Sequence, residues 1–147
     1  MLNRKKLVNA LKEFLEKDKW DTWLTVTFRT PVTSSLAKKK FKYFFKTLNK
    51  PDEEFFKKYI LSCVFVERNK VKKGFHIHAL VKGVAPSLCS RLEEKCREYF
   101  GESRVMPVHE GVIPYLCDKY DTSSLEDWRF FKINSRLRAS KPTAESI

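Results

Sequence analysis

Two histidines separated by one apolar residue lie in residues 74–80, which read Gly-Phe-His-Ile-His-Ala-Leu. This mostly apolar run without proline predicts a β-strand. Side chains alternate between the faces of a strand, so His76 and His78 share one face and Ile77 lies on the other. Their Cα atoms would then be about 7 Å apart, close enough for both imidazoles to bind one metal ion. His109 is the only other histidine in the chain.

A carboxylate is expected beside these histidines. Residues 59–67 form a nearly continuous apolar run, and the polar residues 68–73 connect it to the histidine strand, which predicts an antiparallel hairpin. Glu67 ends the first strand in phase with Cys63 and Phe65, on the face of the two imidazoles. Such a set of two nitrogens and one oxygen leaves coordination positions for phosphate oxygens. The alternative is two hydrogen-bonded histidines on a half-exposed sheet.

The rest of the chain supplies the elements that position this site. The pattern alternates between helical and strand periodicity, with no internal repeat and no long linker. It predicts an α+β fold, a central antiparallel β-sheet with helices packed mainly on one face. The opposite face would stay open for a ligand and would present Thr25 and Thr27 beside the histidines. The expected elements are a helix after Asn3, a strand at 20–28, a helix at 37–48, the hairpin, a helix at 86–101, a strand at 104–108, a helix at 112–121 and a strand at 128–133.

The charge balance favours a polyanionic partner. Thirty Lys and Arg residues against eighteen Asp and Glu give a net charge of +12, which is typical of proteins that bind nucleic acid. A basic surface without a specific partner is the alternative. The lysines of the 37–48 helix could contact a DNA backbone, although a solvated helix face is the simpler interpretation. They are Lys38, Lys39, Lys40, Lys42 and Lys46.

Length and composition predict one domain, residues 1–135, followed by a disordered tail at 136–147 that has no periodicity. The four cysteines show no C-x-x-C spacing and are expected to be reduced and mostly buried. No apolar run reaches the length of a membrane span, and nothing at the start of the chain resembles a signal peptide. We therefore expect a cytoplasmic protein without a membrane partner.

Several segments occur in the order of the three motifs of the HUH endonucleases. They are Trp23-Leu24-Thr25-Val26-Thr27-Phe28, then Glu67-Arg68, then Gly74-Phe75-His76-Ile77-His78-Ala79-Leu80, then Tyr115 with Lys119. The chain resembles in particular the rolling-circle replication initiators of plasmids, phages and archaeal viruses. The similarity covers roughly residues 20–135. The His-x-His motif alone is weak, and the combination of segments carries the resemblance.

The resemblance implies a single HUH nuclease domain built on a ferredoxin-like or RRM-like sheet. It implies that His76 and His78 bind Mg²⁺ or Mn²⁺, with Glu67 as the third ligand. It further implies that Tyr115 is the nucleophile and that Lys119 helps to hold a DNA phosphate. Neighbouring hydroxyl and basic side chains are expected to contact DNA: Thr25, Thr27, Arg29, Arg68, Lys72 and Lys73.

The third motif departs from the family pattern, which is usually Tyr-x-x-Lys and is often followed by a second tyrosine. Here Lys119 follows Tyr115 by four positions, so both still share a helix face. Tyr120 lies about 140° around the helix from Tyr115, which favours a single nucleophile. Tyr120 remains the alternative, because it directly follows the lysine. Pro114 is tolerated in a first helical turn and places Tyr115 near the helix N-terminus, which favours an approaching phosphate.

The resemblance implies sequence-specific nicking and rejoining of single-stranded DNA through a covalent 5′-phosphotyrosine, which would initiate rolling-circle replication. It implies a hairpin-associated replication origin as the substrate, in the cytoplasm of a prokaryotic host. The sequence contains no G-x-x-x-x-G-K-[ST] motif, so we expect a separate helicase and no small-molecule cofactor.

Two other interpretations remain open. A single-tyrosine HUH transposase or a plasmid relaxase would use the same chemistry. A non-catalytic RRM-like module is suggested by Lys73-Gly74-Phe75, which begins like an RNP1 motif. That match fails at His76 and Ile77, where a small residue and an aromatic residue belong.

Overall fold

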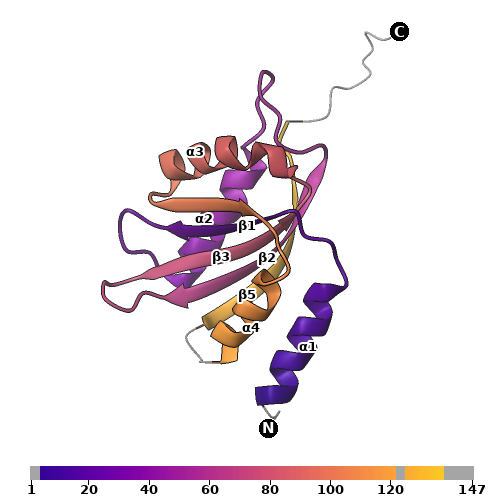
Figure 1. Ribbon diagram of the computed structural model, residues 1–147. Coiled ribbons are helices and arrows are strands. Elements are labelled where there is room, and N and C mark those ends of the chain that lie inside the picture. Colours follow the sequence, from indigo (N-terminus) through magenta and orange to yellow (C-terminus); the bar gives the residue numbers. More distant parts are fainter. Residues whose placement is uncertain (1–3, 122–124, 138–147) are drawn as a thin grey trace.

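The computed structural model describes residues 4–121 and 125–137 (Figure 1). Its centre is one five-stranded antiparallel sheet in the order β4-β1-β3-β2-β5. The strands are β1 (Thr22–Thr27), β2 (Tyr59–Arg68), β3 (Phe75–Lys82), β4 (Ser103–Pro107) and β5 (Leu125–Asn134). The helices are α1 (Arg4–Glu16), α2 (Ser34–Lys46), α3 (Cys89–Tyr99) and α4 (Val112–Asp121), and a short 3₁₀ turn, η1 (Pro86–Leu88), leads into α3.

This architecture confirms the predicted α+β class with a central antiparallel sheet, a ferredoxin-like arrangement. The bounds of α4 agree with the prediction, and the β2–β3 hairpin pairs as expected. Most of the predicted tail, residues 138–147, lies outside the described residues. None of the helices in the described part of the chain combines the length and the apolar character that crossing a membrane requires.

Helices α2 and α3 cover one face of the sheet, where the larger core lies. The side chain of Thr33 caps α2 by accepting a hydrogen bond from the Leu36 N–H at 3.1 Å. The apolar stripe of α2 then packs fully buried against the inward residues of β1, β2 and β3. Phe41 and Phe45 of that stripe are among the largest buried side chains of the protein.

Helices α1 and α4 pack against the other face, so the expectation of helices mainly on one face needs correction. A second apolar cluster joins Leu15 of α1 and Leu116 of α4 to Cys63, Phe65 and Leu80 of the sheet. The physical reason is the continuous apolar run of β2, which places apolar side chains on both faces and therefore needs cover on both. Figure 1 shows α4 in front of the sheet and α2 behind it.

The turn of the β2–β3 hairpin lies against the segment that follows β1. Gly74 in this turn has φ +95°, a conformation that residues with a Cβ rarely adopt. A Cβ at position 74 would lie only 3.0 Å from the Pro31 Cα. Glycine therefore also allows the two backbone segments to approach closely. This contact fixes the start of the histidine strand relative to β1.

Candidate metal centre

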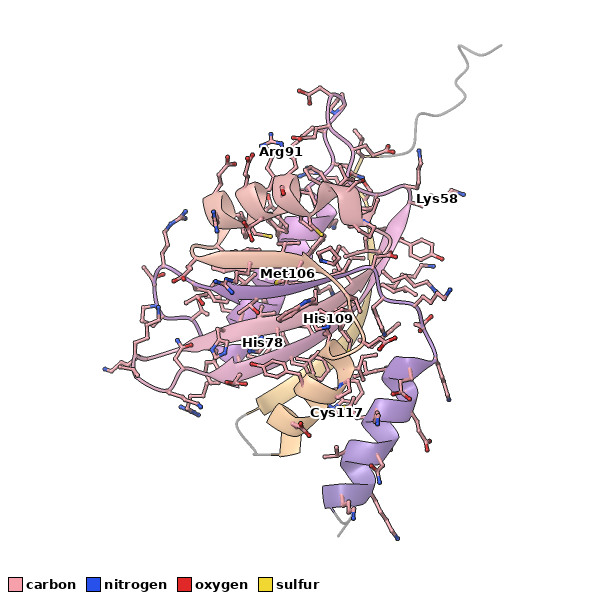
Figure 2. All side chains as sticks on the ribbon, in the orientation of Figure 1. Lys58, His78, Arg91, Met106, His109 and Cys117 are labelled. Atoms are coloured by element: carbon pink, nitrogen blue, oxygen red, sulfur yellow. The ribbon has the colours of Figure 1, made fainter. Side chains whose placement is uncertain are left out.

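The β2–β3 register brings Glu67, His76 and His78 together on the face that carries α1 and α4. Glu67 is paired directly with His76 across the hairpin. Its Oε1 lies 3.4 Å from His76 Nε2, and its Oε2 lies 3.9 Å from His78 Nε2. Glu67 and His78 are 2% and 4% exposed, and His76 is partly buried. Figure 2 shows His78 on the sheet and Cys117 on helix α4.

These separations fit a shared metal ion. Nitrogen and oxygen ligands lie about 2.1 Å from most divalent metals, which separates neighbouring ligand atoms by about 3.0–3.5 Å. The three ligand atoms all lie within 4.8 Å of one another, so a small inward movement brings them to this spacing. The triad can therefore hold a metal ion, and the geometry accounts for a carboxylate buried beside two imidazoles.

Hydrogen bonds on the far side of each ring orient the two imidazoles. The Asn69 Nδ2 donates to the Lys73 carbonyl at 3.1 Å, so the Asn69 Oδ1 is the atom that faces His76. This oxygen lies 2.7 Å from His76 Nδ1, which must therefore carry the proton and donate it. His78 Nδ1 lies 3.2 Å from Thr25 Oγ1. With its proton on Nδ1, His76 directs its Nε2 lone pair at the carboxylate, as metal binding requires. His78 does the same when its Nδ1–H donates to the Thr25 hydroxyl.

Asn69 is a site residue that sequence reasoning missed. It sits in the hairpin turn, where an asparagine ordinarily indicates only turn geometry. Its N–H also donates to the Gly74 carbonyl at 2.9 Å, so the turn and the ligand His76 are held by the same residue.

The two threonines of β1 lie on the same face as the triad, as predicted. Thr25 is paired with His78 and Thr27 with His76 across β1 and β3. On the other side of β1, Arg104 of the edge strand β4 is paired with Thr25 and is exposed. Directly paired residues share a face, so this arginine belongs to the face of the metal triad. Sequence reasoning missed Arg104, because nothing in the sequence indicated that β4 pairs with β1.

The other predicted DNA contacts, Arg29, Arg68, Lys72 and Lys73, are not paired with the triad across the sheet. The Arg29 guanidinium donates to the Glu98 carbonyl at 3.0 Å and also to the Arg97 carbonyl. Both carbonyls belong to the last turn of α3 and have no partner within the helix. Arg68 stands over the Phe75 ring, with 5.1 Å between the guanidinium carbon and the ring centre. Residues 72–73 lie exposed in the hairpin turn, next to the His76 end of the site.

Helix α4 exposes Tyr115 to solvent on the side of the sheet that carries the candidate triad. Tyr115 is 47% exposed, whereas the next residues, Leu116 and Cys117, are buried against the sheet and α1. Its N–H donates to the Gly111 carbonyl, so Tyr115 follows the first turn of the helix as predicted. The other two residues predicted for this helix are Lys119 and Tyr120. The side chains of these two positions lie outside the described part of the structure.

The cysteines do not compete for the metal. All four are buried and form no disulfide, in agreement with the sequence prediction. Burial raises the pKa of Cys63, the cysteine on the strand of Glu67, to about 12, with a further contribution from Cys117. Burial also raises the pKa of Cys117, which lies on α4. Both thiols are therefore protonated at neutral pH and are poor ligands and nucleophiles.

Comparisons with protein-family models, with curated proteins and with solved structures find no match to this chain.

Proposed function

We propose that this protein is an HUH endonuclease that nicks and rejoins single-stranded DNA through a covalent tyrosine intermediate. The observation that carries the proposal is the buried triad of Glu67, His76 and His78 on the face of the sheet where α4 exposes Tyr115. A metal-ligand set and an exposed nucleophile on one face are the parts that a phosphodiester transfer needs. The order of these residues in the sequence is also that of the family motifs.

The proposed cofactor is Mg²⁺ or Mn²⁺. When bound, either ion would polarise a phosphodiester and offset the negative charge that develops on its oxygens. The protein's own contribution is to fix both Nε2 atoms and the Glu67 carboxylate toward one point. Asn69 and Thr25 do this through the opposite nitrogen of each ring.

Tyr115 is the proposed nucleophile. Its oxygen attacks the phosphorus, the bond to the 3′ oxygen of the preceding nucleotide breaks, and that oxygen leaves as a 3′-hydroxyl after taking a proton. The tyrosine proton passes to solvent, and the DNA stays linked as a 5′-phosphotyrosine. The reverse attack by a 3′-hydroxyl restores the strand without ATP, because the ester conserves the bond energy. Lys119, one turn after Tyr115, is the proposed phosphate contact.

The proposed substrate is a single-stranded segment at a hairpin-associated replication origin, and the reaction would begin rolling-circle replication in a prokaryotic cytoplasm. The open side of the metal face supports a single strand, since it combines the cation Arg104 with the exposed apolar residue Met106 and the half-buried Trp23. A separate protein would supply the helicase activity.

An RRM-like module without catalysis is less consistent with the structure. RRM domains stack bases on the aromatic positions of RNP1, which correspond to Phe75 and Ile77 here. Ile77 is fully buried in the core beneath α2 and α3, and Phe75 packs against the same core. Neither position faces a surface on which a base can stack. A transposase or relaxase would share the whole site, and the joined DNA product would distinguish it from an initiator.

Covalent trapping tests the proposal. The purified chain is incubated with a pool of single-stranded oligonucleotides and Mn²⁺, and a denaturing gel reports protein that migrates with attached DNA. We expect a metal-dependent adduct, with peptide mapping to Tyr115. Tyr59→Phe is the matched control, because Tyr59 is similarly exposed at 43% but lies at the far end of β2. Adduct formation in EDTA, or an adduct on another residue than a tyrosine of α4, would refute the proposed mechanism.

A further inference from the structure

A basic groove runs between helix α2 and the edge strand β5, with a volume of about 390 Å³. Helix α2 contributes Lys39, Lys42, Tyr43 and Lys46, and β5 contributes Lys132 and Asn134. Because α2 packs on the face opposite to the metal triad, this groove is separate from the candidate metal centre. The three lysines of α2 recur at positions that share one helix side.

The charge of this groove is not neutralised within the described residues. No acidic side chain lines it, and none of its four lysines forms an ion pair with a described carboxylate. Two of the lysines are placed over aromatic rings instead. Lys42 Nζ lies 5.2 Å from the centre of the Phe131 ring, and Lys132 Nζ lies 4.3 Å from that of Tyr59. These contacts hold cations at the groove without removing their charge.

The positive surface continues beyond the end of α2. The Arg136 N–H donates to the Lys46 carbonyl at 2.7 Å, which places residue 136 directly after the last lysine of α2. Arg136 and Lys50 line an adjoining hollow of about 290 Å³ that also contains no acidic side chain. The cations therefore form a track rather than an isolated cluster.

The chemistry of this track selects its ligand. From Lys39 to Lys46 the helix rises about 10 Å, which corresponds to the rise of about three nucleotides along a strand. A second copy of the chain is a poor occupant, because lysines on an edge strand repel one another. We propose that the α2–β5 groove binds the sugar–phosphate backbone of nucleic acid, as a second contact site independent of the metal centre. Tyr43, 54% exposed at the groove, offers a ring on which an unpaired base can stack.

Lysine replacement tests this assignment. Lys39, Lys42 and Lys46 are changed together to Gln, which keeps helix propensity and removes three charges. The matched control changes the exposed lysines Lys12, Lys17 and Lys19 to Gln, with the same loss of charge. Fluorescence anisotropy then measures binding of a 20-base-pair duplex and of a 20-nucleotide single strand between 50 and 300 mM NaCl. EDTA is present throughout, so the proposed nicking reaction does not enter the result.

We expect the groove variant to lose at least tenfold in affinity at 0.1 M salt for one of the two probes, with a log–log salt slope smaller by about two to three. The control variant should stay within twofold of the wild type. A loss of affinity for the duplex alone assigns the groove to paired DNA. A loss of affinity for the single strand alone assigns it to an unpaired segment, and Tyr43→Ala should then weaken single-strand binding as well. Equal losses in both lysine variants, or no loss in the groove variant, would overturn the proposal.

Discussion

Replacing Asn69 tests whether the hairpin turn sets the metal affinity. Asn69→Ala removes the acceptor for the His76 Nδ1–H and also the donor to the Lys73 carbonyl. Without that acceptor, the imidazole can rotate, and its other tautomer, with the proton on Nε2, becomes accessible. That tautomer directs a proton instead of a lone pair at Glu67 and the metal. We therefore expect weaker metal binding although Asn69 is not itself a ligand.

The magnitude follows from the hydrogen bond that is lost. The contact is 2.7 Å long and partly buried, and such a bond contributes about 0.5–1.5 kcal/mol. That range corresponds to about a twofold to twelvefold change in an equilibrium constant. Partners of metal-bound histidines usually change metal affinity by about 10-fold to 100-fold, so we expect Mn²⁺ to bind about tenfold more weakly.

Isothermal titration calorimetry with Mn²⁺ measures the effect without requiring any nuclease activity. Asn69→Asp is the matched variant, because its carboxylate still accepts from His76 but no longer donates to Lys73. We expect this variant to keep an affinity close to that of the wild type. An unchanged affinity in Asn69→Ala would refute the positioning role. An equal loss in both variants would show that the turn, and not the contact with His76, is responsible.

Three further predictions concern the site and its surroundings. Glu67→Gln should abolish Mn²⁺ binding by calorimetry while circular dichroism shows a folded protein, since the amide keeps the shape but not the charge; unchanged binding would exclude this ligand. Tyr115→Phe should bind single-stranded DNA normally and form no covalent adduct, whereas Tyr120→Phe should retain most of the adduct formation of the wild type. The opposite result would identify Tyr120 as the nucleophile. The pKa of Cys63 is raised to about 12, so between about pH 9 and pH 12 only the unfolded thiol ionises, and the free energy of unfolding should fall as the pH rises. Urea titrations measure this dependence, and Cys63→Ala should make it less steep.

The metal triad was predictable because its geometry follows from local rules. Alternation along β3 places His76 and His78 on one face, and an antiparallel hairpin places Glu67 opposite them. The start of α4 was predictable as well, because Pro114 is tolerated in the first turn of a helix.

The features that sequence reasoning missed depend on non-local packing. Arg104 joins the metal face only because β4 pairs with β1, a contact that no local pattern specifies. Asn69 faces His76 because the turn is fixed by Gly74 against Pro31. Arg29, predicted as a DNA contact, also donates to carbonyls at the end of α3, a contact that no local pattern indicated. Each of these depends on segments that are distant in the sequence.

The three residues of the candidate metal triad all lie within residues 67–78, which affects how the site assembles. A single hairpin brings them together, and closing so short a loop has a small entropic cost and takes about 1–10 μs. Helix α4, which carries the proposed nucleophile, instead packs against Leu11 and Leu15 of α1, near the other end of the chain. The triad and the helix that carries Tyr115 therefore depend on different contacts for their placement. The ligand set can form early in synthesis, before the helix that would carry out the attack exists.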